Sequence, residues 1–477
     1  MKTRCELRMP RSMYEELAAH LFPGDGDEHG AVIQAGLLQT RSGPVLTARS
    51  LVLAEEGKDW VPGNRGYRML LAPFIAKQAR LCRDEKLVYL AVHNHGGNDS
   101  VAFSSVDIES HERGFPALLD LVEGMPVGSL VFAPNAVAGD IWFPGGERLT
   151  LDRLVVVGAK RKILRPRPEH MAVGDDGRFD RQVRLFGVKG QAILAGSRVA
   201  IIGLGGVGSL LAELLARLGV GHFVLVDPDR VDPTNVPRLV DATSWDAMAW
   251  LVDKRRPEWL RKLGRRLATK KVDLSRRVIR RANRKARVER HFSVMEKPEV
   301  AEAIKDCDYI FLAADGHRAR RLFNALVHQY LIPGVQMGTR IQVDPETGAV
   351  IDVHTTTRPV TPAKGCMLCN QAVSQARLRD ESITQEMRAG QRYVDEDESP
   401  APSVITLNAL SASQAANDFL FYITGLVNDD AFGGTIQGRP LKRTLRFVDP
   451  RRGKGCPDCG SGGRLARGDK ARLPLIE

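Results

Sequence analysis

The sequence predicts a two-domain α/β protein whose second domain is a Rossmann-like, doubly wound sheet. The chain has 477 residues, which is too long for one ordinary hydrophobic core. Short apolar runs alternate with segments of helical spacing along most of its length. One such run, R-V-A-I-I, leads into the glycine-rich turn 203–208, which is typical of a nucleotide-binding βαβ unit.

The composition fits a globular protein of the cytoplasm, with 43% apolar and 26% charged residues. The N-terminus lacks the apolar run of a signal peptide, and glycines interrupt the longest apolar stretch, so no membrane partner is expected. Much of the net charge of +12 lies in residues 254–290. This basic segment fits a solvated helical surface or an acidic protein partner. Nucleic acid is a weaker match, because the second half has no aromatic residues for stacking on bases.

Residues 1–160 predict an α/β or α+β domain. Short runs rich in branched residues predict strands at 31–38, 50–56, 86–95, 128–135 and 153–159. Apolar spacing predicts helices over 68–85 and 106–122. Residues 161–176 are charged and contain prolines, as expected of a linker.

The second domain is expected over residues 177–465, followed by a tail, 466–477. Its glycine-rich turn alone fits either a dinucleotide or a nucleoside triphosphate. Asp227 ends the next predicted strand, where a ribose ligand is expected in both cases. Asn235 and Arg238 follow closely and favour a triphosphate, because arginine binds phosphate through two parallel hydrogen bonds.

Five elements in the same order resemble the adenylating domain of ubiquitin-activating enzymes and their bacterial ThiF-type relatives. They are R-F-D-R-Q at 178–182, G-L-G-G-V-G at 203–208, D-P-D-R-V-D-P-T-N-V-P-R at 227–238, Lys271 and Asp315. The resemblance covers roughly residues 175–465, with an apparent insertion between Arg238 and Lys271.

The resemblance implies ATP and Mg²⁺ as cofactors and a homodimer. Asp227 would bind the ribose, Asp315 the Mg²⁺, and Arg181 the γ-phosphate from the partner subunit. The remaining nucleotide ligands would be Gly203, Gly205, Gly206, Gly208, Asp229, Asn235, Arg238 and Lys271. The substrate would be a small ubiquitin-like protein that ends in glycine, with a conjugating enzyme as a further partner.

Two Cys-x-x-Cys pairs predict a structural zinc site of four thiolates, Cys366, Cys369, Cys456 and Cys459. Many relatives carry a catalytic cysteine between the two pairs, but this chain has none there. The adenylate would then be the final product, pass directly to a partner's thiol, or form an oxyester. Ser399 and Ser403 are the candidate nucleophiles for the oxyester.

The N-terminal domain carries H-N-H at 93–95, followed by S-S-V-D at 104–107. Two histidines and an aspartate leave a fourth zinc position open for water, as in a catalytic site. The pattern resembles the JAMM (JAB/MPN) metalloproteases, which have a mixed sheet with flanking helices. Zinc would be bound by His93, His95 and Asp107, Ser104 would bind the oxyanion, and Glu28 would be the base. Glu55 and Glu56 are alternative bases.

Together the two resemblances predict an enzyme that adenylates a ubiquitin-like protein and cleaves peptide or isopeptide bonds after it. One alternative is an adenylyltransferase for a sulfur-carrier protein in cofactor or cysteine synthesis, with a protease domain that matures the carrier. A non-catalytic scaffold that binds ATP and the small protein is another, and a dinucleotide oxidoreductase is the most distant.

Overall fold

The computed structural model describes residues 4–61, 69–169, 177–344, 346–382, 402–426 and 433–476. The chain divides into two compact units. Unit 1 comprises Met1–Met171 with His328–Leu331 and Pro457–Arg472, and unit 2 comprises Ala172–Val327, Ile332–Cys456 and Leu473–Glu477. Among the described residues, no helix is long and apolar enough to cross a membrane.

Unit 1 is built on a nine-stranded mixed sheet of order β7-β6-β5-β4-β2-β3-β1-β8-β9. The strands are β1 (Glu6–Pro10), β2 (Gly30–Thr40), β3 (Gly43–Leu53), β4 (Val88–Asn94), β5 (Val127–Ala133), β6 (Ala136–Trp142), β7 (Arg148–Thr150), β8 (Arg153–Val157) and β9 (Lys162–Leu164). The helices are α1 (Arg11–Leu21), α2 (Ala72–Glu85) and α3 (Ser105–Val122).

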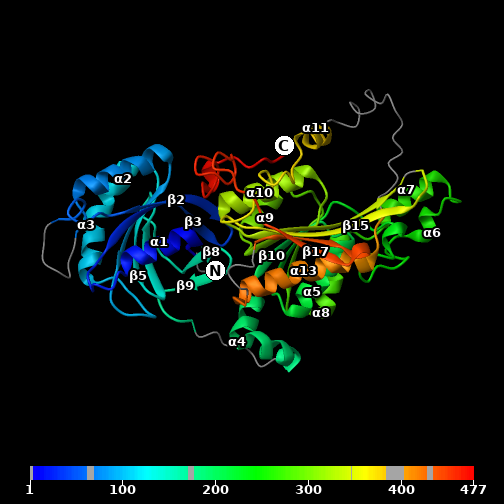
Figure 1. The fold of residues 1–477 in the computed structure, drawn as a ribbon, viewed down its shortest axis with the longest axis horizontal. Helices are drawn as coiled ribbons and strands as arrows, with labels where there is room; N and C mark the ends of the chain where they lie inside the picture. Colours follow the sequence, from blue (N-terminus) through cyan, green and yellow to red (C-terminus); the bar gives the residue numbers. More distant parts are fainter. Residues whose placement is uncertain are drawn as a thin grey trace. The chain divides into compact units, whose positions relative to one another are not determined.

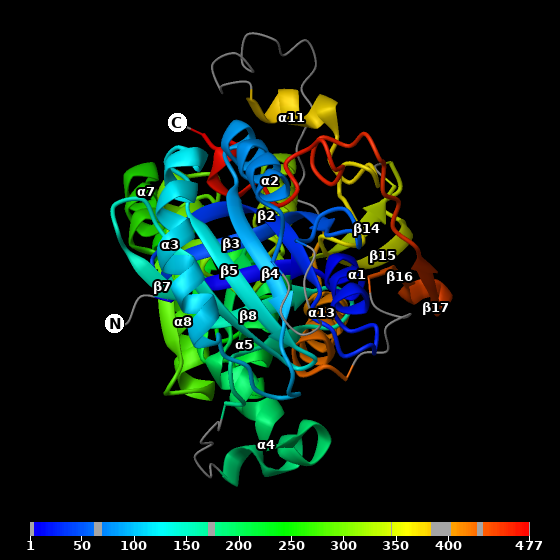
Figure 2. The ribbon, with the colours of Figure 1, turned by 90° about the vertical axis from the view of Figure 1, so that its left-hand side faces the viewer.

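Both faces of the unit 1 sheet are buried, because successive side chains of a strand point to opposite faces. On β2, Ala31 and Ile33 join the core that includes Leu17 of α1. Val32 joins the opposite core, which includes residues of α2 and α3. Figure 2 shows α2 and α3 together over the same strands.

The predicted elements of unit 1 are present as β2, β3, β4, β5, β8, α2 and α3. The sequence analysis missed β1, α1, β6, β7 and β9. Strand β9 lies inside the predicted linker, because Leu154–Val156 pair with residues of that segment. The predicted tail is also ordered: Gly468–Lys470 form a 3-10 turn, and Asp469 accepts a hydrogen bond from the backbone of Gln39.

Unit 2 carries an eight-stranded sheet of order β12-β11-β10-β13-β14-β15-β16-β17 (Figure 1). The strands are β10 (Arg198–Ile202), β11 (His222–Val226), β12 (Arg287–His291), β13 (Tyr309–Leu312), β14 (Gly334–Val343), β15 (Val350–Val360), β16 (Thr435–Arg439) and β17 (Thr444–Val448). The first five strands in the sheet order pair in parallel, as predicted for a Rossmann-like domain. Strands β15, β16 and β17 extend it as an antiparallel sheet that was not predicted.

The helices of unit 2 are α4 (Asp180–Gly196), α5 (Gly206–Leu218), α6 (Ala249–Val252), α7 (Glu258–Leu267), α8 (Lys271–Ala282), α9 (Pro298–Lys305), α10 (His317–Tyr330), α11 (Gln375–Ser382) and α13 (Ile405–Thr424). Most of the predicted basic segment forms α7 and α8. Parallel strands β10, β11 and β13 end at one edge of the sheet, and this edge receives the glycine-rich turn, Asp227 and Asp315.

Candidate functional site

The glycine-rich turn connects β10 to α5 in a backbone that only glycine allows at two positions. Gly203 has a φ of 86°, and a Cβ there would lie 2.8 Å from the backbone nitrogen of Ala314. A Cβ at Gly208 would lie 1.9 Å from the carbonyl oxygen of Gly203. Gly205 differs, because a Cβ there would meet no atom within 4 Å. The turn therefore packs tightly on one side and leaves open space at Gly205.

Asp227 is buried directly beneath this turn. Its two carboxylate oxygens accept hydrogen bonds from the backbone nitrogens of Leu204 (2.6 Å) and Asp229 (2.8 Å). Burial raises the pKa of Asp227, although Lys271 and the two backbone donors oppose this effect. The Nζ of Lys271 lies 2.7 Å from Asp229 and 3.9 Å from Asp227. Four predicted nucleotide ligands are thus brought together: the turn, both aspartates and the lysine.

Asp315, Asn235, Arg238 and Arg181 are placed less directly. Asp315 is exposed at the end of β13, next to the backbone that contacts Gly203. Asn235 is buried and forms a capping box with Asp232, and Arg238 donates to the carbonyl of Thr234. Arg181 is exposed on α4 and, within the described ranges, forms no hydrogen bond or ion pair with the other candidates.

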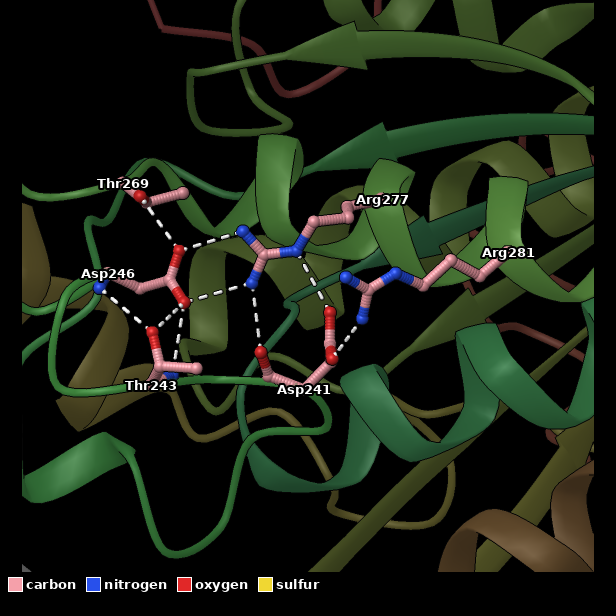
Figure 3. A network of polar contacts seen from close by, with 6 residues as sticks. All are labelled: Asp241, Thr243, Asp246, Thr269, Arg277 and Arg281. Carbon is pink, nitrogen blue, oxygen red and sulfur yellow. Dashed lines mark hydrogen bonds and ion pairs between the residues drawn. The ribbon is translucent and has the colours of Figure 1, made fainter.

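A network of ion pairs fixes the loop before α6 to helix α8, which carries Lys271 at its start (Figure 3). Arg277 donates two 2.9 Å hydrogen bonds to the carboxylate of Asp246 and two to Asp241, one to its carboxylate and one to its backbone carbonyl. Asp246 also accepts hydrogen bonds from Thr243 and Thr269. Burial alone would raise the pKa of Asp246, but these hydrogen bonds outweigh it and lower the pKa to about 2.

We expect Arg277→Ala to lower the free energy of unfolding of the protein by about 2 kcal/mol, because it leaves the Asp246 carboxylate, whose side chain is 6% exposed, without its cation. The effect stays below that of a fully buried pair, since Arg277 itself is 36% exposed. Arg281→Ala is the control and should cost under about 1 kcal/mol, because Arg281 is 65% exposed. Urea denaturation measures both, and equal losses would contradict the proposed importance of Arg277.

Of the two candidate oxyester nucleophiles, Ser399 lies outside the described residues. Ser403 precedes α13, and its Oγ accepts a 3.0 Å hydrogen bond from Nδ2 of Asn408. A Cβ at Gly206 would lie 2.2 Å from Nδ2 of Asn408 and 3.5 Å from Oγ of Ser403. Ser403 therefore lies next to the glycine-rich turn. Asn408 could not be predicted as a residue of this site, because no motif surrounds it in the sequence.

The four cysteines of the two Cys-x-x-Cys pairs form a single cluster, with their sulfur atoms all within 4.8 Å of one another. Cys366 and Cys456 have sulfurs 3.7 Å apart, too far for a disulfide and close to the sulfur–sulfur spacing of about 3.8 Å in a tetrahedral Zn²⁺ site. The backbone nitrogen of Gly453 donates to the sulfur of Cys369 at 3.2 Å, and Nδ2 of Asn324 donates to that of Cys366 at 3.6 Å. The donor set fits one structural Zn²⁺.

In unit 1, His93, His95 and Asp107 converge as a second group with the chemistry of metal ligands. The Nε2 atoms of the two histidines are 3.2 Å apart, and each lies 3.4–3.5 Å from an oxygen of Asp107. Nδ1 of His95 is 3.2 Å from the carbonyl oxygen of Ala102. Donation to this carbonyl leaves Nε2 unprotonated, which is the form that binds a metal.

Helix α3 supplies Asp107 and Ser104 through its capping box. The Oγ of Ser104 donates to Asp107 at 2.8 Å and accepts from its backbone nitrogen. Burial raises the pKa of Asp107, but hydrogen bonds from His93 and Ser104 outweigh it, so the pKa lies below its ordinary value. Ser104 thus orients Asp107.

Glu28 is the predicted base that the fold brings to this group. Strands β2 and β4 pair with Gly30 opposite His93, and Asn94 accepts a hydrogen bond from the backbone of His29. This register places Oε1 of Glu28 3.8 Å from Nε2 of His95. Glu55 is exposed and paired with Lys58, which favours Glu28 over Glu55 as the base.

A model of the ThiF family matches residues 179–457, which is more than half of the chain. The chain belongs to the ThiF family. Among curated relatives, tRNA threonylcarbamoyladenosine dehydratase of Bacillus subtilis is 52% identical over 64 residues, or 13% of this chain and 25% of that protein. Adenylyltransferase and sulfurtransferase MOCS3 of Drosophila persimilis is 41% identical over 78 residues, or 16% of this chain and 17% of that protein.

The matched segments therefore span a quarter or less of these relatives' length. The crystal structure of Escherichia coli MccB with ATP aligns at 16% identity and a TM-score of 0.43, covering 61% of this chain and 75% of that one. The ThiF match contains every predicted nucleotide ligand and begins at residue 179, after the histidine group of unit 1. The JAMM resemblance therefore stays a prediction.

For this ThiF protein we expect Cys456→Ser to lower the zinc content of the purified chain from about one structural ion, because a three-thiolate site lacks one ligand of the closed tetrahedron. The melting temperature should fall with it. Cys307→Ser is the matched control, since Cys307 is a buried thiol outside the cluster. Unchanged zinc in Cys456→Ser, measured by mass spectrometry of the metals, would contradict the cluster as a zinc site.

Proposed function

We propose that unit 2 uses ATP and Mg²⁺ to adenylate the C-terminal carboxylate of a small ubiquitin-like protein that ends in glycine. The observation that carries the proposal is the arrangement around the glycine-rich turn. A buried carboxylate under the turn, a lysine within 4 Å of it and a second carboxylate at the same sheet edge suit ribose, phosphate and metal respectively. Membership of the ThiF family supports the same reading.

The reaction needs positioning and charge neutralisation more than covalent chemistry. A carboxylate oxygen of the terminal glycine forms a bond to the α-phosphorus of ATP, and the bond from that phosphorus to pyrophosphate breaks. Lys271 and Arg238 would hold the phosphates, and Asp227 the ribose. Asp315 would hold Mg²⁺, which neutralises charge on the departing pyrophosphate when bound. Arg181 would come from the partner subunit of a homodimer.

We propose that unit 1 is a hydrolase that cleaves peptide or isopeptide bonds after the same terminal glycine. His93, His95 and Asp107 would hold zinc, which would supply a water of lowered pKa when bound. Glu28 takes the proton of the attacking water and gives it to the departing amine. Ser104 orients Asp107, and it would bind the oxyanion by turning its single hydroxyl proton from Asp107 to the substrate. The two units would therefore form and break bonds at one protein terminus.

The fate of the adenylate follows from the missing cysteine. No thiol lies between Cys369 and Cys456 in the sequence, so a thioester cannot form there. Either the adenylate passes to a partner's thiol, or a serine hydroxyl forms an oxyester. Ser403 is the better placed candidate among described residues, since it lies next to Gly206 of the turn.

A second candidate is the activation of a sulfur-carrier protein, with unit 1 maturing the carrier. The similarity to an adenylyltransferase and sulfurtransferase favours it, as does the missing thiol. Intact-mass measurement separates the candidates. The chain is mixed with ATP, Mg²⁺ and a glycine-ended ubiquitin-like protein. The masses of both proteins are then measured before and after hydroxylamine treatment.

An adenylate on the small protein supports activation. A hydroxylamine-labile adduct on this chain that is lost in Ser403→Ala supports the oxyester. Conversion of the small protein to a thiocarboxylate when a sulfur donor is added supports the sulfur carrier. No adenylate and no adduct under any condition would contradict the proposed function.

The two neighbouring glycines of the turn give a contrasting pair of variants. Gly205→Ala should leave the melting temperature unchanged, because its Cβ meets no atom within 4 Å and its φ is −73°. It should raise the KM for ATP about tenfold or more, since the methyl group enters the open space where a phosphate would approach the backbone.

Gly206→Ala should instead destabilise the protein by about 1–3 kcal/mol, because its Cβ would overlap Asn408. Thermal denaturation and steady-state kinetics measure both effects. A Gly205→Ala enzyme with unchanged KM for ATP would place the nucleotide elsewhere.

A further inference from the structure

Residues 245–267, which contain helices α6 and α7, expose an unusual concentration of tryptophan. Three of the five tryptophans of the chain lie between residues 245 and 259. Trp245 is 74% exposed, Trp250 is 52% exposed and Trp259 is 66% exposed. Large aromatic side chains are normally buried, so their exposure in one short segment marks an interaction surface.

Helix α7 continues this surface with a stripe of apolar side chains. Trp259, Leu263 and Leu267 are spaced by four residues and therefore lie on one side of the helix. Leu263 is 41% exposed and Leu267 is 52% exposed. The adjacent face is already packed, because a Cβ at Gly264 would lie 2.7 Å from Leu251 of α6. Only the side of α7 that faces away from α6 remains available to bind a partner.

The same segment carries cations that the protein itself does not neutralise. Glu258 is shared between Arg261 and Arg265. Within the described part of the chain, no ion pair is found for the exposed side chains of Lys254, Arg255, Arg256, Lys262 and Arg266. On a helical wheel Lys262 and Arg266 border the apolar stripe. The stripe is therefore bordered along one side by Arg266 and by Lys262, whose charge Glu258 offsets only in part.

The segment is an ordered platform. Asp246 near its start accepts a hydrogen bond from Thr269, which follows its end. Asp246 also accepts hydrogen bonds from Arg277 of α8, and these contacts fix both ends of the segment (Figure 3). Helix α7 has Glu258 in its first turn and Arg265 and Arg266 in its last, charges that favour the helix dipole.

We propose that the α6–α7 platform, residues 245–267, binds the surface of an anionic lipid bilayer. Helix α7 would lie in the plane of the interface, with its tryptophan and leucines among the acyl chains and its cations against the headgroups. This is a peripheral contact, distinct from a membrane span, and it differs from the sequence-based expectation of no membrane partner. It stands independently of the proposed adenylation.

Two features favour lipid over other anionic partners. Single-stranded nucleic acid would use the aromatic rings but offers nothing to Leu263 and Leu267, because bases stack on π faces. A groove in an acidic protein would take only the apolar face of α7 and would leave Trp245 and Trp250, which lie outside α7, without a partner. A flat, anionic and apolar layer complements the whole outer side at once.

The test uses the full-length chain and vesicles of phosphatidylcholine alone or with about one third phosphatidylglycerol. We expect cosedimentation only with the anionic vesicles, weakened by salt, and a blue shift of tryptophan fluorescence. Lys262→Ser with Arg266→Ser should weaken binding about 25-fold, from about fivefold per cation lost. Trp259→Ser with Leu263→Ser should weaken it at least as much.

The matched controls are on β17, where Leu445 is 78% exposed and Arg446 is also exposed. Leu445→Ser with Arg446→Ser should bind vesicles as the parent does. Circular dichroism confirms that each variant is folded. The proposal is overturned by absence of binding to anionic vesicles or by an equal loss in the β17 control. It is also overturned if the α7 residues instead drive self-association or the binding of an oligonucleotide or acidic peptide.

Discussion

Replacing Asp315 with alanine is expected to lower ATP–pyrophosphate exchange about 10²–10³-fold, the cost of removing one preorganised electrostatic group from a transition state. Asp315 follows β13 at the sheet edge that also carries the glycine-rich turn. The backbone just before it contacts the turn, since a Cβ at Gly203 would lie 2.8 Å from the nitrogen of Ala314. A carboxylate there is suited to hold Mg²⁺ on the phosphates.

The melting temperature of Asp315→Ala should stay within a few degrees of the parent, because the side chain is exposed. Glu213→Ala is the matched control. It removes a carboxylate from α5 that, among the residues the structure describes, is paired only with Arg217, and exchange should be unaffected. Full exchange activity in Asp315→Ala would show that the metal is held by other residues or that the nucleotide binds elsewhere.

Replacing Glu28 with glutamine is expected to lower hydrolysis of a fusion to the small protein about 10²–10⁴-fold, as for loss of a general base. Glutamine keeps the size of the side chain and cannot take a proton. Zinc bound at His93, His95 and Asp107 should remain, because Glu28 is outside that group. The measurement pairs the rate of cleavage with the metal content of each variant.

Glu55→Gln is the control, since Glu55 is exposed and paired with Lys58. It should cleave as the parent does. If Glu55→Gln loses activity while Glu28→Gln keeps it, the base is Glu55, and the proximity of Glu28 to His95 that follows from the pairing of β2 with β4 has no catalytic role.

The sequence was sufficient to predict those elements that depend on residues close together in the chain. The turn at 203–208 and the strands β10, β11 and β13 follow from glycines and branched residues close in sequence. The family match confirms the ThiF resemblance drawn from five short motifs. The sequence favours Glu28 as the base, with Glu55 and Glu56 as alternatives, but the pairing of Gly30 with His93, which brings Glu28 to 3.8 Å from His95, is not readable from it.

Contacts between distant segments could not be predicted from the sequence. The segment Pro457–Arg472 belongs to unit 1, where Thr47 donates to the carbonyl of Ala466 and Arg49 to that of Ser461. Gly36 is required there, because a Cβ would lie 2.4 Å from the oxygen of Ala466. These partners are more than 400 residues apart in sequence, beyond the reach of any periodicity. The antiparallel strands β15–β17 were missed for a different reason: β14 pairs with β15 and β16 with β17 over short separations, but β17 is exposed along its whole length and so lacks the alternation of buried and exposed residues that predicts a strand.

The most direct test of the account is ATP–pyrophosphate exchange by the full-length chain, measured with and without a glycine-ended ubiquitin-like protein. We expect little exchange by the chain alone and a large increase when the small protein is added. A version of the small protein that lacks its terminal glycine should give no increase. Exchange that never depends on the small protein, or that responds to tRNA in its place, would contradict the central claim that this chain activates a protein carboxylate.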